Sequence, residues 1–152
     1  MTGAVAFLSD GALDVRDMPV LKIPRGATTK RELDAAVLSD WFGDMLVDQP
    51  HHAFVERVGA MPGQGVSGVF AFGKCYGIVL GILAALEIPV TLVSAAKWKK
   101  ALSVPASKDG ARLRASQLMP QHAAQWARVK DHGRAEAALI ALWGSQHLTP
   151  TR

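Results

Sequence analysis

Two acidic side chains stand in this chain where a carboxylate is costly to bury. Glu56 interrupts the apolar strand pattern of residues 53–58, and Glu136 opens a helix pattern rich in alanine and leucine. A half-buried carboxylate costs several kcal/mol unless a counter-charge compensates it. A bound divalent metal ion is one such counter-charge, so both residues are candidate metal ligands.

Two further candidates lie just before Glu136. A hard cation such as Mg²⁺ takes carboxylate oxygens and water, which suits Asp131. His132 and Glu136 are four residues apart, so they can share one face of a helix. Asp131 approaches the same face if the helix begins two residues after it.

Each acid also has an ordinary structural interpretation, which the residues alone leave open. Glu56 can be an edge-strand acid paired with Arg57 or with a lysine on a helix. Asp131 can be a helix cap, and Glu136 can be a first-turn acid stabilised by the helix dipole. The metal interpretation therefore requires the strand and the helix start to meet.

A basic cluster with an aromatic residue occupies residues 97–100, and a glycine-rich loop occupies residues 59–65. The lysines suit phosphate contacts, or they form a solvated turn with Trp98 in the core. Gly63 and Gln64 let a backbone approach a phosphate closely, or they form a simple flexible loop.

Composition bounds the class of protein. The chain has 152 residues, predicted as one domain, and 49% hydrophobic residues, enough for a core. A net charge of +4 is compatible with binding to nucleic acid but does not require it.

The single cysteine, Cys75, excludes an internal disulfide and fits a reducing cytoplasm. No secretory signal is expected, and Glu87 and Pro89 break the apolar stretch 78–93, so no membrane span is predicted.

Hydrophobic periodicity and turn signals predict alternating strands and helices around these candidates. A hairpin is expected over 4–18, followed by a loop with Pro19, Pro24 and Gly26. Thr29 is expected to cap a helix that runs to residue 47. Gly73, Gly77 and Gly81 form a stripe predicted to press closely on a sheet. The remaining elements expected are strands at 52–58 and 90–93 and helices at 66–86, 95–102, 108–118 and 134–143, the last closed by Gly144. This order is typical of an α/β fold with a mixed sheet.

The order and spacing of six segments resemble the RuvC-type Holliday junction resolvases, in the variety found in phages and prophages. The resemblance covers nearly the whole chain. The segments are Val55–Val58, Met61–Gly65, Phe72–Gly77, Ile88–Val93, Trp98–Lys100 and Asp131–Ala137.

The resemblance implies a ribonuclease-H-like mixed sheet flanked by helices, a homodimer, and a Mg²⁺-dependent endonuclease acting on four-way junction DNA, with Mn²⁺ as a possible substitute. Glu56 matches the acid of the family's fourth strand, and Glu136 matches its last acid. The remaining helix ligand falls on Asp131 or His132, because the usual spacing lands on Gly133. The residues expected to contact DNA are Gly63, Gln64, Lys97, Lys99, Lys100 and Arg112.

One departure from the family lies at the N-terminus, where residues 1–6 already match the family's second strand. The first, central strand and its Asp are therefore expected to be absent from this chain. Removing a central strand leaves backbone groups unpaired at a cost of about 1–3 kcal/mol each. A late start codon, a truncated piece and a degenerate protein are all compatible with this pattern. Two alternative functions stay open: an inactive junction-binding protein, and another phage nuclease of the same fold.

Overall fold

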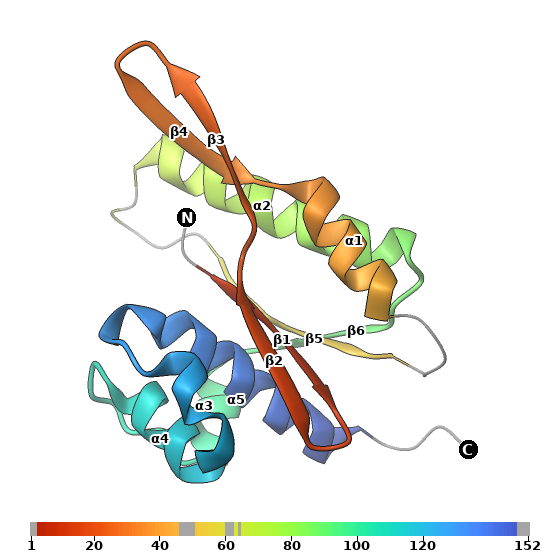
Figure 1. The fold of residues 1–152 in the computed structure, drawn as a ribbon, viewed down its shortest axis with the longest axis vertical. Coiled ribbons are helices and arrows are strands. Elements are labelled where there is room, and N and C mark those ends of the chain that lie inside the picture. The colour runs from red at the N-terminus through yellow and green to blue at the C-terminus, as the bar shows by residue number, and fades with distance from the viewer. Residues whose placement is uncertain (1–2, 46–50, 60–62, 64, 149–152) are drawn as a thin grey trace. The chain divides into compact units, whose positions relative to one another are not determined.

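The computed structural model describes residues 3–45, 51–59, 63 and 65–148. Two hairpins open the described chain, helices and strands then alternate from α1 to β6, and helices follow to the end (Figure 1). The strands are β1 (Ala4–Ser9), β2 (Ala12–Asp17), β3 (Val20–Arg25), β4 (Thr28–Leu33), β5 (Ala53–Glu56) and β6 (Val90–Val93). The α-helices are α1 (Ala35–Met45), α2 (Val66–Ala85), α3 (Ala95–Ala101), α4 (Gly110–Leu118) and α5 (His132–His147), and the 3₁₀ helices are η1 (Pro120–Trp126) and η2 (Val129–Asp131).

The chain divides into two compact units, each described here by itself. Unit 1 comprises Met1, Met18–Ala53 and Val58–Thr91. Unit 2 comprises Thr2–Asp17, Phe54–Arg57 and Leu92–Arg152. The prediction of a single domain over residues 1–152 stays a prediction.

The hairpin β1–β2 opens unit 2 as the sequence predicts. Its antiparallel register runs from Ala4 opposite Asp17 to Ser9 opposite Ala12. Asp10 and Gly11 form the turn with φ angles of 49° and 82°. Positive φ at both central residues matches the right-handed twist of the two strands, so this local pair fixes the register.

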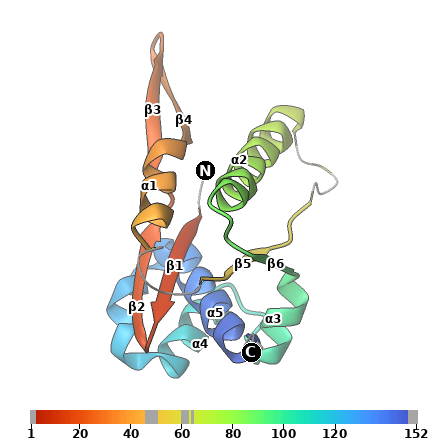
Figure 2. The ribbon, with the colours of Figure 1, turned by 90° about the vertical axis from the view of Figure 1, so that its right-hand side faces the viewer.

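Helix α5 lies against both strands of this hairpin (Figures 1 and 2). Ala135, Ala138 and Leu139 recur at helical spacing and are fully buried, and Trp143 follows one turn later at 2% exposure. The small alanines let the helix approach the strands closely. The core of unit 2 also holds Leu13, Val15, Val93, Trp98, Leu102, Ala115, Met119 and Trp126.

Strands β5 and β6 form a separate two-stranded sheet, and the boundary between the units falls within both strands. Phe54 of β5 meets Trp143 of α5 edge to face, with ring centroids 5.8 Å apart. Its ring also lies against the backbone of Gly144, where a Cβ would overlap ring atoms. The prediction that Gly144 closes this helix is wrong, because α5 continues past it to His147. The glycine instead leaves room for the ring of Phe54.

Unit 1 departs from the sequence prediction at its start. Strands β3 and β4 form an antiparallel hairpin where a loop and a helix start were expected. Gly26 adopts φ 57° in the tight turn between them. Thr29 therefore belongs to β4, and Asp34 instead caps α1, its Oδ1 accepting a hydrogen bond from the amide of Val37 at 3.1 Å.

Helix α2 presents most of its surface to solvent within the described part of the chain. Gly73, Gly77 and Gly81 have nothing within 4 Å of an added Cβ, so the prediction that this stripe presses on a sheet is wrong. The helix is long and apolar enough to cross a membrane by length and composition, whereas the apolar stretch 78–93 predicted no such segment. Lys74 near its middle pairs with Glu32 at 2.9 Å, and a charge at that depth is costly in a bilayer.

Candidate active site

Glu56 ends β5 and shares a strand face with Phe54, because side chains alternate along a strand. Since Phe54 contacts Trp143, that face points toward α5. The indole Nε1 of Trp98 donates a hydrogen bond to Glu56 Oε1 at 3.0 Å. Trp98 is fully buried, so this carboxylate satisfies a polar group that water cannot reach.

Glu136 lies seven residues before Trp143 on α5, which places both on one helix face two turns apart. The ammonium of Lys99 lies 3.2 Å from Glu136 Oε1. The same ammonium lies 5.1 Å from the ring centroid of Trp98. Lys99 thus contacts both the acid on α5 and the indole that holds the acid on β5.

The two candidate acids are therefore joined through adjacent residues of α3. Glu56 accepts from Trp98, and Glu136 pairs with Lys99. All four side chains belong to unit 2. Both Lys99 and Glu136 are more than a third exposed, so their ion pair is worth about 0–1 kcal/mol. An incoming cation or phosphate can displace it at little cost.

Asp131 takes part in a different network. Its carboxylate accepts from the guanidinium of Arg128 at 2.9 Å on each oxygen, and from the Arg128 amide at 3.1 Å. These bonds lower the pKa of Asp131 to about 2, with the Arg128 side chain as the largest cause. Asp131 is 5% exposed and forms the capping box of η2. Its carboxylate is therefore committed to holding the turn that starts α5.

His132 and Arg134, in the first turn of α5, also have different surroundings. His132 is exposed at the first position of the helix. Arg134 donates to Asp17 from Nε and a terminal nitrogen, at 2.8 and 2.7 Å. That bidentate pair lowers the pKa of Asp17, the Arg134 hydrogen bond being the largest cause, and it ties the helix start to the end of β2.

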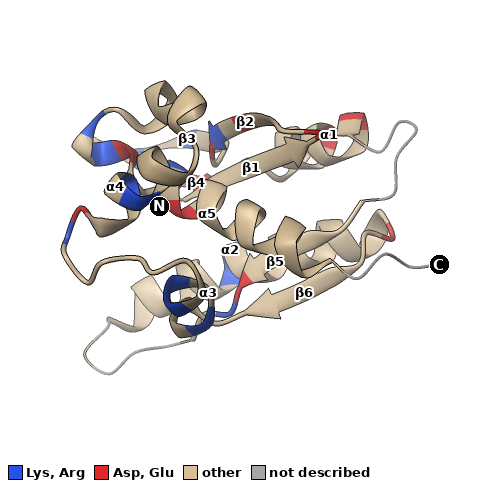
Figure 3. Ribbon diagram, turned by 90° about the horizontal axis from the view of Figure 1, so that it is seen from below, with Lys and Arg blue, Asp and Glu red and all other residues tan. Residues whose placement is uncertain are grey.

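The residues expected to contact DNA have different surroundings. Lys97, Lys99 and Lys100 lie on the short helix α3, which Figure 3 shows as a concentrated basic element. Lys97 lies 5.4 Å from the ring centroid of Trp143. Gly63 is exposed with φ 83°, and Gln64 lies outside the described residues.

Arg112 differs from the lysines because three of its N–H donors bind groups of the protein. It donates to the carbonyls of Trp126 and Ala127 at 2.9 and 2.7 Å, and to Asp109 at 2.8 Å. These bonds fasten α4 to the turn after η1. Each terminal nitrogen carries a second N–H, so a phosphate contact by Arg112 does not require these bonds to open.

The described residues do not fit a complete metal centre. Among them, no three His, Cys, Asp or Glu side chains come close enough to hold an ion. The structure brings Glu56 and Glu136 to the Trp98–Lys99 pair, while the carboxylate of Asp131 faces Arg128. Metal binding at this site therefore stays a prediction.

The sequence offered a core position for Trp98 as one of two alternatives but did not predict its bond to Glu56. A buried indole needs an acceptor, and that need is the signal that could have suggested the pair. The partnerships of Arg128 with Asp131 and of Arg134 with Asp17 were also missed. Arg134 and Asp17 lie 117 residues apart, and no local pattern connects them.

Comparison with known proteins identifies the fold. The chain is similar to T. thermophilus RuvC in complex with Holliday junction substrate, at 16% identity, 97% coverage of each chain and a TM-score of 0.53. A second Thermus thermophilus RuvC structure shares 18% identity over 96% of each chain, with a TM-score of 0.44. No protein-family model and no curated protein sequence matches. The predicted α/β fold class is confirmed, and the fold is similar to that of the RuvC structure.

Proposed function

We propose that this protein is a structure-selective DNA endonuclease that resolves four-way junctions. The observation that carries the proposal is the placement of Glu56 and Glu136 on either side of the Trp98–Lys99 pair. Fold alone does not assign function, so the proposal rests on this arrangement within a RuvC-like fold. The lysines of α3 supply positive charge next to the two acids, where a phosphodiester would lie.

The activity needs at least one more acidic group than the pair provides. The β1–β2 and β5–β6 sheets are separate, yet strands of both contact α5. Asp131 or His132 is the proposed ligand at the helix start, and Mg²⁺ or Mn²⁺ the proposed ion. Phosphodiester hydrolysis with two metal ions is the chemistry such a complete site would supply.

A homodimer would match two opposed strands of a symmetric junction with two equivalent sites. The exposed apolar side chains of α2 support this part of the proposal. Val66 and Phe70 lie one turn apart on the same helix face and are 87% and 74% exposed, and exposed apolar residues that adjoin one another mark interaction surfaces. A second copy of the chain would cover these side chains. The proposed location of the protein is the cytoplasm.

One observation favours a second function, that of a junction-binding protein without cutting activity. The ammonium of Lys99 pairs with the carboxylate of Glu136, and the described residues contain no cluster of three metal ligands. Binding to phosphates requires neither a complete set of metal ligands nor a metal ion.

The test incubates the full-length protein with a synthetic four-way junction, a matched duplex and a single strand, with Mg²⁺ or with a chelator. A resolvase cuts the junction in preference to the other two substrates and only when the metal is present. Tight junction binding without cutting supports the second function. Equal cutting of all three substrates would indicate another nuclease of the same fold and contradict the proposal.

A further inference from the structure

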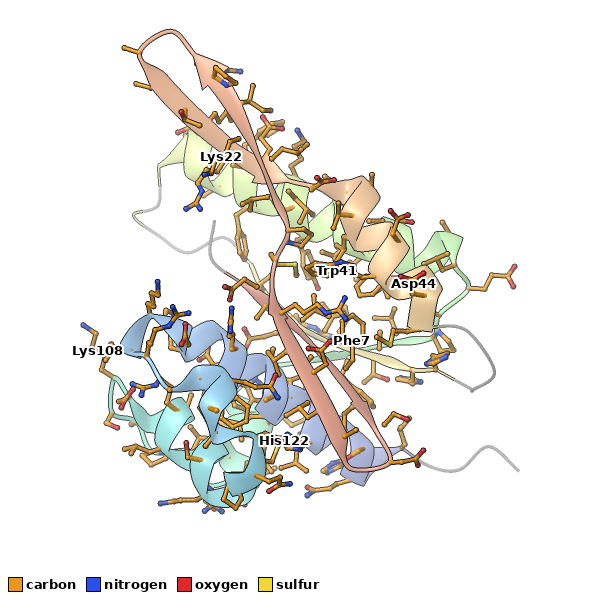
Figure 4. The ribbon with its side chains drawn as sticks, viewed as in Figure 1. Phe7, Lys22, Trp41, Asp44, Lys108 and His122 are labelled. Carbon is orange, nitrogen blue, oxygen red and sulfur yellow. The ribbon has the colours of Figure 1, made fainter. Side chains whose placement is uncertain are left out.

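The hairpin β3–β4 of unit 1 is exposed along most of its length. All of residues 21–31 are exposed, including the apolar side chains of Leu21 and Ile23 at 47% and 37%. Lys22, Arg25, Lys30 and Arg31 all lie on it, and Glu32 is its one acidic residue. Figure 4 shows Lys22 extending from this hairpin.

The strand register places two of these cations directly opposite one another. Lys22 pairs with Arg31, and side chains of opposed residues project from the same face of the hairpin. Like charges in that position destabilise a two-stranded sheet. Together with Thr29, the two residues line a shallow open hollow on the hairpin. Two cations around a hollow form a site that an anion would stabilise.

The one acid of the hairpin does not neutralise this pair. Glu32 lies opposite Leu21, on the other face, and it binds Lys30 at 2.8 Å and Lys74 of α2 at 2.9 Å. Within the described residues, Lys22 and Arg31 make no ion pair. The positive charge of Lys22 and Arg31 therefore stays uncompensated on their face, while on the opposite face Glu32 pairs with Lys30 and Lys74.

We propose that the Lys22–Arg31 face binds phosphate groups of duplex DNA, as a contact separate from α3. The planar fork of Arg31 suits two phosphate oxygens, and the ammonium of Lys22 adds a point charge beside it. Opposed side chains start about 5 Å apart, so one phosphate can meet both. The hydroxyl of Thr29 adds a neutral donor. This inference rests on the proposed function, since it names a second contact to the same DNA.

The experiment measures affinity for a four-way junction across a salt series by fluorescence anisotropy. The logarithm of the association constant falls linearly with the logarithm of the salt concentration, and each lost phosphate contact makes this slope shallower by about 0.9. The Lys22→Ala/Arg31→Ala variant is therefore expected to have a slope that is shallower by about 2 than that of the parent. Its affinity at moderate salt should fall on the order of tenfold. The charge-conserving variant Lys22→Arg/Arg31→Lys is expected to keep both values near those of the parent.

A matched control removes the same charge elsewhere. Lys108→Ala/Lys130→Ala replaces two exposed lysines of unit 2 and is expected to change the slope less. Circular dichroism should show both alanine variants folded, and the hairpin variant should not lose Tm, because like-charge repulsion is removed. An unchanged slope in the hairpin variant, or an equal loss in the control, overturns the hairpin contact while leaving junction binding intact. A parent that binds no junction DNA overturns the proposed function together with this inference.

Discussion

Trp98 and Lys99 give the two candidate acids opposite environments. Glu56 accepts from a buried indole, which fixes its carboxylate in one orientation at the end of a strand. Glu136 meets an ammonium on a partly exposed side chain, which can leave when another cation arrives. The carboxylate of Asp131 is not available in either way, because both of its oxygens accept hydrogen bonds from Arg128. At the level of single residues, Glu56 and Glu136 are the acids best placed for chemistry.

The role of Asp131 in holding η2 predicts a pH-dependent effect on stability. Its folded pKa of about 2 lies below the ordinary value of 3.8, so its contribution is complete above 3.8 and is lost as pH falls toward 2. Asp131→Asn should lower Tm near neutral pH, and the gap to the parent should close over that acidic window. Thermal unfolding followed by circular dichroism measures it. Exposed Asp40 serves as control, since Asp40→Asn should leave Tm unchanged, and a gap that is constant with pH would contradict the role.

Local signals predicted several elements well because neighbouring residues determine them. Strand β6 has its predicted bounds, and Ser94 caps α3 by accepting from the Lys97 amide at 3.3 Å. The hairpin β3–β4 was missed because Pro24 and Gly26 are typical of loops. In the structure, Gly26 makes a tight turn and Pro24 sits within an exposed strand. The partners of Glu56 and Asp131 depend on packing between distant segments, which one sequence does not report.

Replacing a helical glycine with alanine is expected to lower stability at Gly144, where β5 contacts α5, and to raise it at Gly43, which has open space around it. Gly144→Ala forces a Cβ into the ring of Phe54, and overpacking of this kind costs about 1–3 kcal/mol. Gly43→Ala on α1 meets open space and should gain up to about 1 kcal/mol from helix propensity. Thermal unfolding should show Tm lower by roughly 3–10 °C for the first and slightly higher for the second. A stable Gly144→Ala variant would show that Phe54 does not fix the strand.

At the scale of the whole molecule, the exposed apolar side chains of α2 predict self-association. Phe70→Glu places a charge among apolar residues that a second copy would cover, so the variant should be monomeric where the parent is a dimer. Light scattering coupled to size exclusion gives both masses. Lys108→Glu, on an exposed lysine of unit 2, should leave the parent's mass unchanged. A monomeric parent, or a dimeric Phe70→Glu variant, would count against the dimer.

The central claim is that Glu56 supplies charge to a junction-cutting site. The decisive measurement is the rate at which full-length protein and its Glu56→Gln variant cut a labelled four-way junction with Mg²⁺. The amide oxygen of Gln can still accept from Trp98, so the variant should fold and bind the junction while its rate falls on the order of 100-fold or more. Glu87→Gln, the same change at an exposed turn, should cut like the parent. If Glu56→Gln cuts as fast as the parent, the role assigned to this carboxylate is wrong.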